Sequence, residues 1–203
     1  MWCGVMAPYS TGMEIASGPR ATQNSDAITE KRQRRLQNLR PWRRLLTACG
    51  SNPLLNAVVT LALNTALRKN EIRTLRWSQI DFEKRTVTVG RAKTQAGSGR
   101  VIPLNQLAFG ALAKWAGRLV ESKAEDYVFP ACQAAGIERK NPDMERIDPS
   151  RPIKSWRSTW RAALRRAGLQ IRFHDLRHIC ITKLAESQAS EHTLMAIAGH
   201  VSR

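Results

Sequence analysis

Tyrosine is scarce in this sequence of 203 residues, occurring at positions 9 and 127 alone. The four cysteines, at positions 3, 49, 132 and 180, lack the short paired spacing of zinc sites and small disulfide frameworks. The sequence also lacks an apolar run of the ~20 residues that cross a bilayer. Its first residues lack the charged start and apolar centre of a signal peptide. These absences predict an intracellular, cytoplasmic protein with reduced thiols and no membrane association.

Acidic residues are also few. The chain has 16 Asp and Glu against 33 Lys and Arg, which gives a net charge of +17 and a pI near 11.0. A merely basic surface is the simplest explanation, but the excess runs through the whole chain rather than through one tail. We therefore favour a polyanionic partner, most often a nucleic acid.

The chain divides by composition into three parts. Residues 1–29 mix Gly, Ser, Pro and Thr with few large aliphatics, so we expect a flexible segment and assign it no function. Residues 30–49 are basic and helical in pattern. This run is either a solvated helix face or a phosphate-contacting surface, and both interpretations stay open. Under the second, the DNA-binding candidates are Arg32, Arg34, Arg35, Arg43 and Arg44.

A folded domain is expected over residues 50–203, starting with a buried helix that Asn52 caps and Pro53 opens. A short helix should follow in "NEIRTLRW". Alternating residues in "TVTV" and "RVIPL" then predict an antiparallel hairpin with Lys93 at its edge.

The rest of the domain is predicted to be mostly helical. Asn105 should open a helix to about Glu121, "YVFP" should be extended, and residues 131–152 should form a surface loop. A basic helix ending at Gly168 and two further helices complete the pattern. The fold class predicted is mainly α with a small antiparallel β-sheet (α+β).

Phosphodiester cleavage without a metal needs a particular set of side chains. Guanidinium groups suit the charge that gathers on the non-bridging oxygens, and proton transfer calls for groups such as histidine and lysine. His174 and Arg177 share a helix face at a spacing of three. The order Arg68, Lys93, His174, Arg177, His200 is more specific than any member alone.

Each residue also has a plain structural explanation. Arg68 can pair with Glu71, Lys93 can be an ordinary hairpin charge, and His200 can satisfy carbonyls at a helix end. His178 is expected on a different helix face from the pair, in a structural role. Trp77, Trp156 and Trp160 are expected to pack in the core.

From about residue 50 to 203 the sequence resembles the catalytic domain of the tyrosine recombinases, the phage integrase family. The resemblance is carried by "TALRKNEIRTLRWSQID", "AKTQAGSGRVIPL", "YVFP", "RFHDLRH" and "AGH", in the family's order. It implies the fold of a DNA breaking-rejoining enzyme.

The resemblance also implies roles. Arg68 and Arg177 would clamp the scissile phosphate, and His174 would accept the proton of the nucleophile. Lys93 would protonate the departing 5′ hydroxyl, and His200 would donate a hydrogen bond to the phosphate. No metal or other cofactor is implied. The partner would be double-stranded DNA at a recombination site, with homo-oligomers on DNA and association with a bacterial or phage-type nucleoid.

The family's nucleophile is a tyrosine two to three helical turns beyond the histidine of "AGH". Neither Tyr9 nor Tyr127 occupies that position. We therefore expect a domain that lacks its C-terminal end, from a truncated copy or one that receives its tyrosine in trans, and a core-binding region in residues 30–49 that is incomplete. The alternative is a non-catalytic DNA-binding remnant or a regulator of an intact recombinase. A third possibility, an unrelated basic DNA- or RNA-binding protein, is disfavoured by the order of the motifs.

Overall fold

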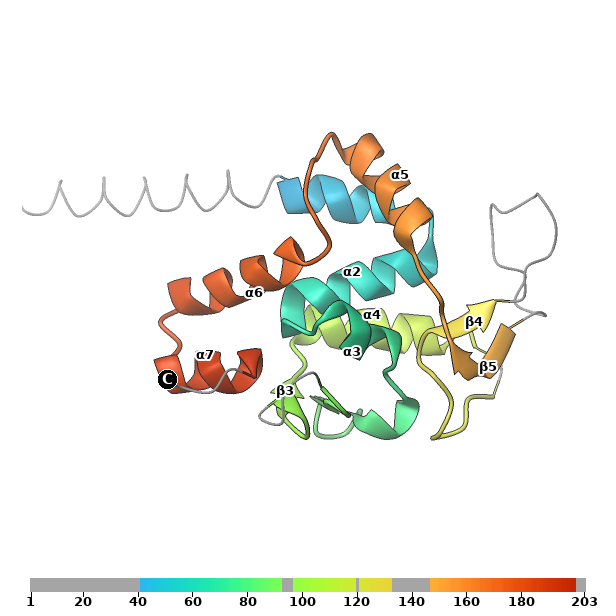
Figure 1. Cartoon of the computed structure of the whole chain (residues 1–203), viewed down its shortest axis with the longest axis horizontal. Coiled ribbons are helices and arrows are strands. Elements are labelled where there is room, and N and C mark those ends of the chain that lie inside the picture. Colours follow the sequence, from blue (N-terminus) through green and yellow to red (C-terminus); the bar gives the residue numbers. More distant parts are fainter. Residues whose placement is uncertain (1–40, 93–96, 120, 133–146, 200–203) are drawn as a thin grey trace, which may run out of the picture. The chain divides into compact units, whose positions relative to one another are not determined.

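The computed structural model describes residues 41–92, 97–119, 121–132 and 147–199. The chain divides into two units, residues 1–40 and 41–203, and all described residues belong to the second (Figure 1). The expectations for the flexible segment 1–29 and for Arg32, Arg34 and Arg35 therefore lie outside the described residues.

Helix α2 (Pro53–Thr65) lies at the centre of the fold. Asn52 caps it by accepting a hydrogen bond from the Leu55 amide at 2.8 Å, and Pro53 stands in its first turn. Its side chains are buried almost all round, because α4 (Gln106–Ala116) and α6 (Asp175–Glu186) both pack on it (Figure 1). The predicted buried helix is confirmed.

Residues 41–49 form a helix that packs into the same core. Leu45 and Cys49 are fully buried. Arg166 donates to the Ala48 carbonyl at 2.7 Å and so satisfies an acceptor at the end of this helix. The core therefore includes residues before position 50, where we expected the folded domain to begin.

A three-stranded antiparallel sheet joins β1 (Ile80–Asp81), β2 (Thr86–Thr88) and β3 (Val101–Pro103) in that order. Val87 pairs with Ile102, and both side chains are buried. The residues on either side of this pair are less buried or exposed, which is the alternation of a sheet with one covered face. The predicted hairpin is confirmed, and Lys93 lies outside the described residues.

Two predicted boundaries are wrong. The helix opened by Asn105 ends at Ala116 rather than near Glu121, because the chain passes into a turn at Gly117, a poor helix former. Residues 131–152 are not all loop, since β4 (Pro130–Cys132) pairs with β5 (Ile147–Pro152). The strand β5 is poorly buried, so backbone pairing rather than an apolar pattern forms it.

The remaining helices follow the sequence closely. The segment "NEIRTLRW" divides into α3 (Lys69–Arg73) and a 3₁₀ turn, η1 (Trp77–Gln79). Helix α5 (Arg157–Ala167) ends at Gly168 and α7 (Glu191–Ala198) at Gly199, both with the positive φ that glycine allows.

The interior between α5 and α6 is aromatic. Trp156 and Trp160 are buried and lie 5.2 and 5.4 Å from the ring of Phe173, as expected for core residues. Trp77 is partly buried against the same core. The fold is mainly α with small antiparallel sheets, so the predicted class is confirmed. Within the described ranges, no helix has the length and apolarity to cross a membrane.

Candidate active site

Two helix ends meet at the side chain of Arg177. Helix α2 finishes at Ala66, whose left-handed φ of 53° is uncommon for a residue other than glycine. Arg177, on α6, donates hydrogen bonds to the carbonyls of Ala66 and of Ala198, the last residue of α7. The sharp turn at Ala66 leads directly to Arg68, which is the N-cap of α3.

Glu71 is the buried anion of this region. Its Oε1 accepts from Arg68 Nη1 at 3.0 Å and from Arg100 Nη1 at 3.1 Å. Its Oε2 accepts from the Arg68 backbone amide at 2.8 Å and from Arg100 Nη2 at 2.6 Å. Burial alone would raise the pKa of Glu71, but the bonds from Arg100 and Arg68 outweigh it and lower the pKa. The carboxylate thus stays ionised between two arginines.

Arg177 is almost fully buried, with 3% of its surface exposed. Burial lowers the pKa of its guanidinium to about 10, and the positive charge of Arg68 adds to the effect. Arg177 remains a cation at neutral pH. The influence of Arg68 on the pKa of Arg177 indicates that the two guanidinium groups lie near each other, as binding of an oxyanion or phosphate would require.

His174 lies on the exposed side of this cluster, one turn before Arg177. Partial burial lowers the pKa of its imidazole, and the nearby charges of His178, Arg177 and Arg172 lower it further, against a smaller opposite effect of Asp175. A lowered pKa favours the neutral imidazole near pH 7, which is the form that accepts a proton.

His178 lies beside His174 rather than apart from the site. The two rings are 4.9 Å apart in an edge-to-face arrangement, and both side chains are exposed. Residues four apart on a helix are neighbours, so the expectation that His178 only faces away from the pair overlooked its contact with His174.

Three of the five catalytic candidates, Arg68, His174 and Arg177, are described, and the structure brings them together. Lys93 and His200 lie outside the described residues. Among the described residues, Gly199 and Gly97 approach closely: a Cβ on Gly199 would lie 3.0 Å from the Gly97 Cα. Arg43 and Arg44, candidates for DNA contact, are exposed on the helix of residues 41–49.

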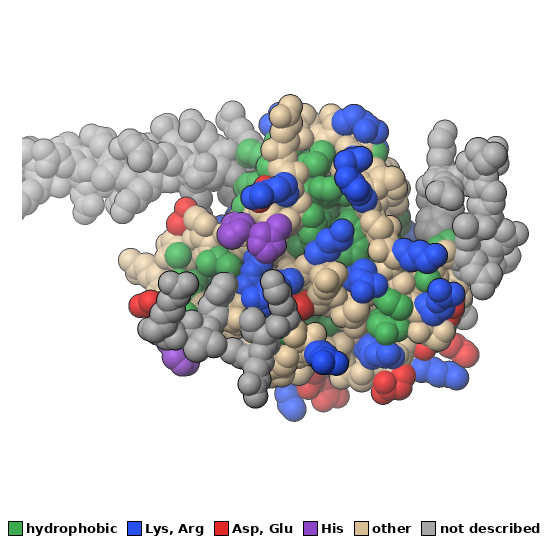
Figure 2. Space-filling model, in the orientation of Figure 1, with side chains coloured by type: hydrophobic (Ala, Val, Ile, Leu, Met, Phe, Trp, Pro, Cys, Tyr) green, Lys and Arg blue, Asp and Glu red, His purple; other side chains and the backbone are tan. Residues whose placement is uncertain are grey.

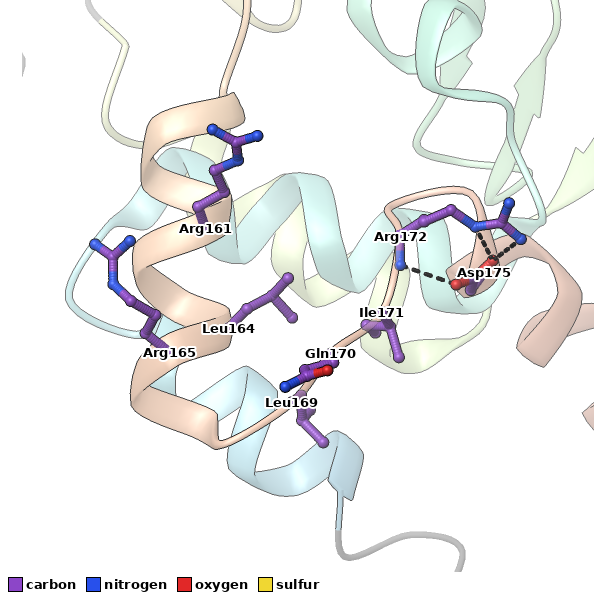
Figure 3. A pocket seen from close by; sticks show the side chains of 8 residues that line it. All are labelled: Arg161, Leu164, Arg165, Leu169, Gln170, Ile171, Arg172 and Asp175. Carbon is purple, nitrogen blue, oxygen red and sulfur yellow. Dashed lines mark hydrogen bonds and ion pairs between the residues drawn. The ribbon is translucent and has the colours of Figure 1, made fainter.

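A cationic groove next to this cluster was not predicted from the sequence. It has a volume of about 680 Å³ between α5 and residues 169–172. Leu164 points from α5 toward Ile171 across it, Arg161 projects upward from the same helix, and Arg165 projects from the side of α5 that faces away from Ile171 (Figure 3). Arg172 folds back onto Asp175, with Nη2 3.0 Å from Oδ1. The sequence feature that could have indicated this groove is the absence of acidic residues from "RSTWRAALRRAGLQIR".

A second hollow of about 340 Å³ continues this groove toward α3 and adds Lys69 and Arg157 to its cations. Asp175 is the single carboxylate among the described residues that line the two hollows. On the face that Figure 2 shows, Lys and Arg side chains spread over the part that carries α5, beside two adjacent histidines, and most acidic side chains lie at the opposite edge. We call the residues lining both hollows the α5 groove.

Tyr127 is held in place by Arg76. The guanidinium carbon lies 4.3 Å from the centre of the ring, and Nη2 donates to the phenol oxygen at 3.0 Å. Tyr127 also forms an isolated β-bridge with Arg76. The segment is packed against the domain, as expected, and its phenol is engaged. Among the described residues, no group of three or more His, Cys, Asp or Glu is placed to hold a metal ion.

The sequence model of the phage integrase family matches residues 41–203. The chain belongs to the phage integrase family. It is 29% identical over 176 residues to the integrase of Salmonella phage P22, covering 85% of this chain and 43% of that protein. It is 28% identical to an Escherichia coli shufflon-specific DNA recombinase, over 93% of this chain and 41% of that one. The chain thus spans less than half the length of these relatives.

Solved structures of integrases share the fold. The crystal structure of XerA recombinase aligns with a TM-score of 0.62 at 22% identity, over 80% of this chain and 55% of that one. The catalytic domain of bacteriophage HP1 integrase aligns with a TM-score of 0.54 at 20% identity, over 80% and 79%. A lambda integrase dimer bound to a core site aligns with a TM-score of 0.54 at 20% identity, over 80% of this chain and 54% of that one. These likenesses establish the fold.

Proposed function

We propose that this chain belongs to an enzyme that breaks and rejoins duplex DNA at specific sites through a 3′-phosphotyrosyl intermediate. The observation that carries the proposal is the placement of Arg177 against the turn that leads to Arg68, one helical turn from the exposed imidazole of His174. Membership of the phage integrase family and relatives named as integrases and recombinases support it.

In the proposed reaction, Arg68 and Arg177 hold the non-bridging oxygens of one phosphate. A tyrosine oxygen attacks the phosphorus while His174 accepts its proton, and the bond to the 5′ oxygen breaks. Lys93 protonates that leaving oxygen, and His200 donates a hydrogen bond to the phosphate. Rejoining reverses these steps, so the phosphotyrosyl bond retains the energy of the broken strand and no external energy source is consumed.

Arg68 is suited to hold the phosphate because its side chain is not enclosed. It is 21% exposed, and in the described part of the chain its guanidinium uses Nη1 alone, on Glu71. The pairing with Glu71 that offers a plain structural explanation is therefore present, and it leaves further N–H groups for a ligand.

The α5 groove is the proposed path of the DNA backbone. Its exposed cations Lys69, Arg157, Arg161 and Arg165 lie along α5 and α3, next to His174 and Arg172. Arg43 and Arg44 would extend the contact, together with Arg32, Arg34 and Arg35. Affinity from such contacts should fall steeply with salt, because each neutralised phosphate releases counterions. A protein bound to DNA in this way would be found with the nucleoid.

The nucleophile is the part of the reaction that the described residues do not provide. Tyr127 is engaged by Arg76, so the proposal requires a different tyrosine, either from a longer form of this protein or supplied in trans by another recombinase on the same DNA. The second candidate function is occupancy of recombination sites without cleavage, and the engagement of Tyr127 is what favours it.

One experiment tests the function. The chain is extended past residue 203 by a helix with a tyrosine two to three turns after His200, and duplexes that it binds are selected from a random pool. The proposal expects protein covalently linked to a DNA 3′ end, lost when that tyrosine is replaced by Phe. Tight binding with no covalent product at any selected duplex would favour occupancy without cleavage.

A further inference from the structure

Arg100 makes an extensive set of enclosed contacts in the site, although it belongs to none of the five catalytic candidates. It directly precedes β3, and its side chain is 6% exposed. Its Nη1 and Nη2 hold the two carboxylate oxygens of Glu71. Nη1 also donates to the Gly97 carbonyl at 2.6 Å, and Nε donates to the Ile197 carbonyl at 3.1 Å.

These bonds join three elements that are distant in sequence. Glu71 lies in α3, Gly97 in the hairpin between β2 and β3, and Ile197 in the last turn of α7. The bond to α7 spans 97 residues of sequence. One guanidinium group therefore sets the spacing between the segment of Arg68, the hairpin and the end of α7.

The backbone is shaped around Arg100. A Cβ on Gly199 would lie 3.2 Å from Arg100 Nη1 and 3.3 Å from its Cδ, and Gly199 has a φ of 61°. Glycine is thus favoured at position 199 both by the left-handed turn and by the close approach of Arg100.

Arg100 differs from Arg68 in what it has left to offer a ligand. Four of its five N–H groups are used by the bonds to Glu71, Gly97 and Ile197. Arg68 is more exposed and uses Nη1 alone among its side-chain donors in the described part of the chain. Arg100 is therefore placed to orient its neighbours, whereas Arg68 can meet a phosphate.

We propose that Arg100 is a positioning residue: by holding Glu71, the hairpin backbone and the last turn of α7 at once, it fixes Arg68 relative to the end of α7. The proposal deepens the proposed function and rests on it. Glu71 links Arg100 to Arg68, because the same two carboxylate oxygens that Arg100 holds also accept hydrogen bonds from the side chain and the amide of Arg68. Loss of Arg100 frees one side of Glu71 and removes the bond to the Ile197 carbonyl, so that α7 keeps the bond from Arg177 to Ala198 but loses its link to Glu71 and the hairpin.

A lysine cannot replace Arg100 in this role. The ammonium group would keep the positive charge beside Glu71, but it is a point donor without the planar fork that reaches two carboxylate oxygens and a distant carbonyl together. Arg100→Lys therefore keeps the positive charge beside Glu71 but removes the set of hydrogen bonds that holds the neighbouring segments. Arg91→Met is the matched control, because Arg91 is an exposed cation of the same hairpin region.

The test uses the full chain as wild type, Arg100→Lys, Arg100→Met and Arg91→Met. Amide hydrogen exchange is measured at residues 197–199, and inorganic phosphate is titrated while the ring signals of His174 are followed by NMR. Arg100→Lys should speed exchange at 197–199 about tenfold, because a local restraint is removed. It should also weaken phosphate binding about fivefold, because Arg68 is no longer oriented. Arg91→Met should match wild type in both.

The outcomes separate this inference from the proposed function. If Arg100→Lys matches wild type in exchange and in phosphate affinity, the positioning role is wrong, even if Arg100→Met fails to fold. A lower melting temperature for Arg100→Lys with unchanged phosphate affinity would also overturn it, since Arg100 would then only stabilise the fold. Absence of any phosphate-dependent shift of His174 in wild type would instead overturn the proposed function.

Discussion

Arg177 donates a hydrogen bond to the carbonyl of Ala66, 111 residues earlier in the chain. Ala66 is the left-handed residue that ends α2, and Arg68 follows two positions later. The same guanidinium reaches the Ala198 carbonyl at the end of α7. Arg177, which we propose as a phosphate ligand, thus also holds the turn that leads to the second proposed ligand, Arg68.

The first prediction concerns this double role. Arg177→Lys should lower the free energy of unfolding by about 3 kcal/mol, because an ammonium cannot replace all the hydrogen bonds of the buried guanidinium. It should also abolish covalent capture of DNA by the tyrosine-extended chain. Chemical denaturation and the capture assay measure the two effects. Arg166→Lys, which alters another arginine bound to a backbone carbonyl, should leave capture intact.

The second prediction concerns how the stability that Glu71 contributes depends on pH. Because the folded-state pKa of Glu71 is below its usual value of 4.5, its contribution to stability is present above that value and is lost as the pH falls through the folded pKa. Glu71→Gln should be less stable than wild type at neutral pH. The difference should shrink below pH 4.5. Melting curves across that range check the sign, and a difference that grows on acidification would contradict the assigned ionisation.

The third prediction concerns His174. Its imidazole should titrate below the usual pKa of 6.5, as read from ring signals in an NMR pH titration. His178→Gln should raise the pKa of His174, because the charge of His178 is one of the influences that lower it. The rise should be partial, since burial is the larger cause. An unchanged pKa in this variant would show that the ring contact has no electrostatic effect.

The fourth prediction concerns the α5 groove. Arg161→Gln with Arg165→Gln should weaken binding to duplex DNA. The slope of log affinity against log salt should become shallower by about 0.9 for each phosphate that the variant no longer neutralises. Lys114→Gln with Arg118→Gln removes the same charge from α4 and the turn after it. Equal effects of the two pairs would mean that net charge, rather than the groove, determines affinity.

Local patterns in the sequence predicted most of the fold. Asn52 and Asn105 both cap helices as predicted, and Gly168 ends α5, because caps depend on a few adjacent residues. Strand β5 could not be predicted in this way. It is formed by pairing with β4, and its poorly buried, polar residues give no alternating signal.

The candidate site was likewise predicted only in part from the sequence. The family motifs singled out Arg68, His174 and Arg177, which the structure brings together. The role of Arg100 was hidden, because a single arginine before a strand resembles any surface cation. Its partners Glu71 and Ile197 lie 29 and 97 residues away, and only the folded chain brings them together.

The most direct test of the account is a phosphate titration followed on the His174 ring. The central claim is that Arg68 and Arg177 hold a phosphate beside this imidazole. Inorganic phosphate should shift the His174 signals in the wild-type chain. Arg68→Lys should weaken the apparent affinity about tenfold, because an ammonium cannot bind two phosphate oxygens as a guanidinium does. Arg91→Met should leave the titration unchanged. Equal titrations of wild type and Arg68→Lys, or no shift in wild type, would contradict the claim.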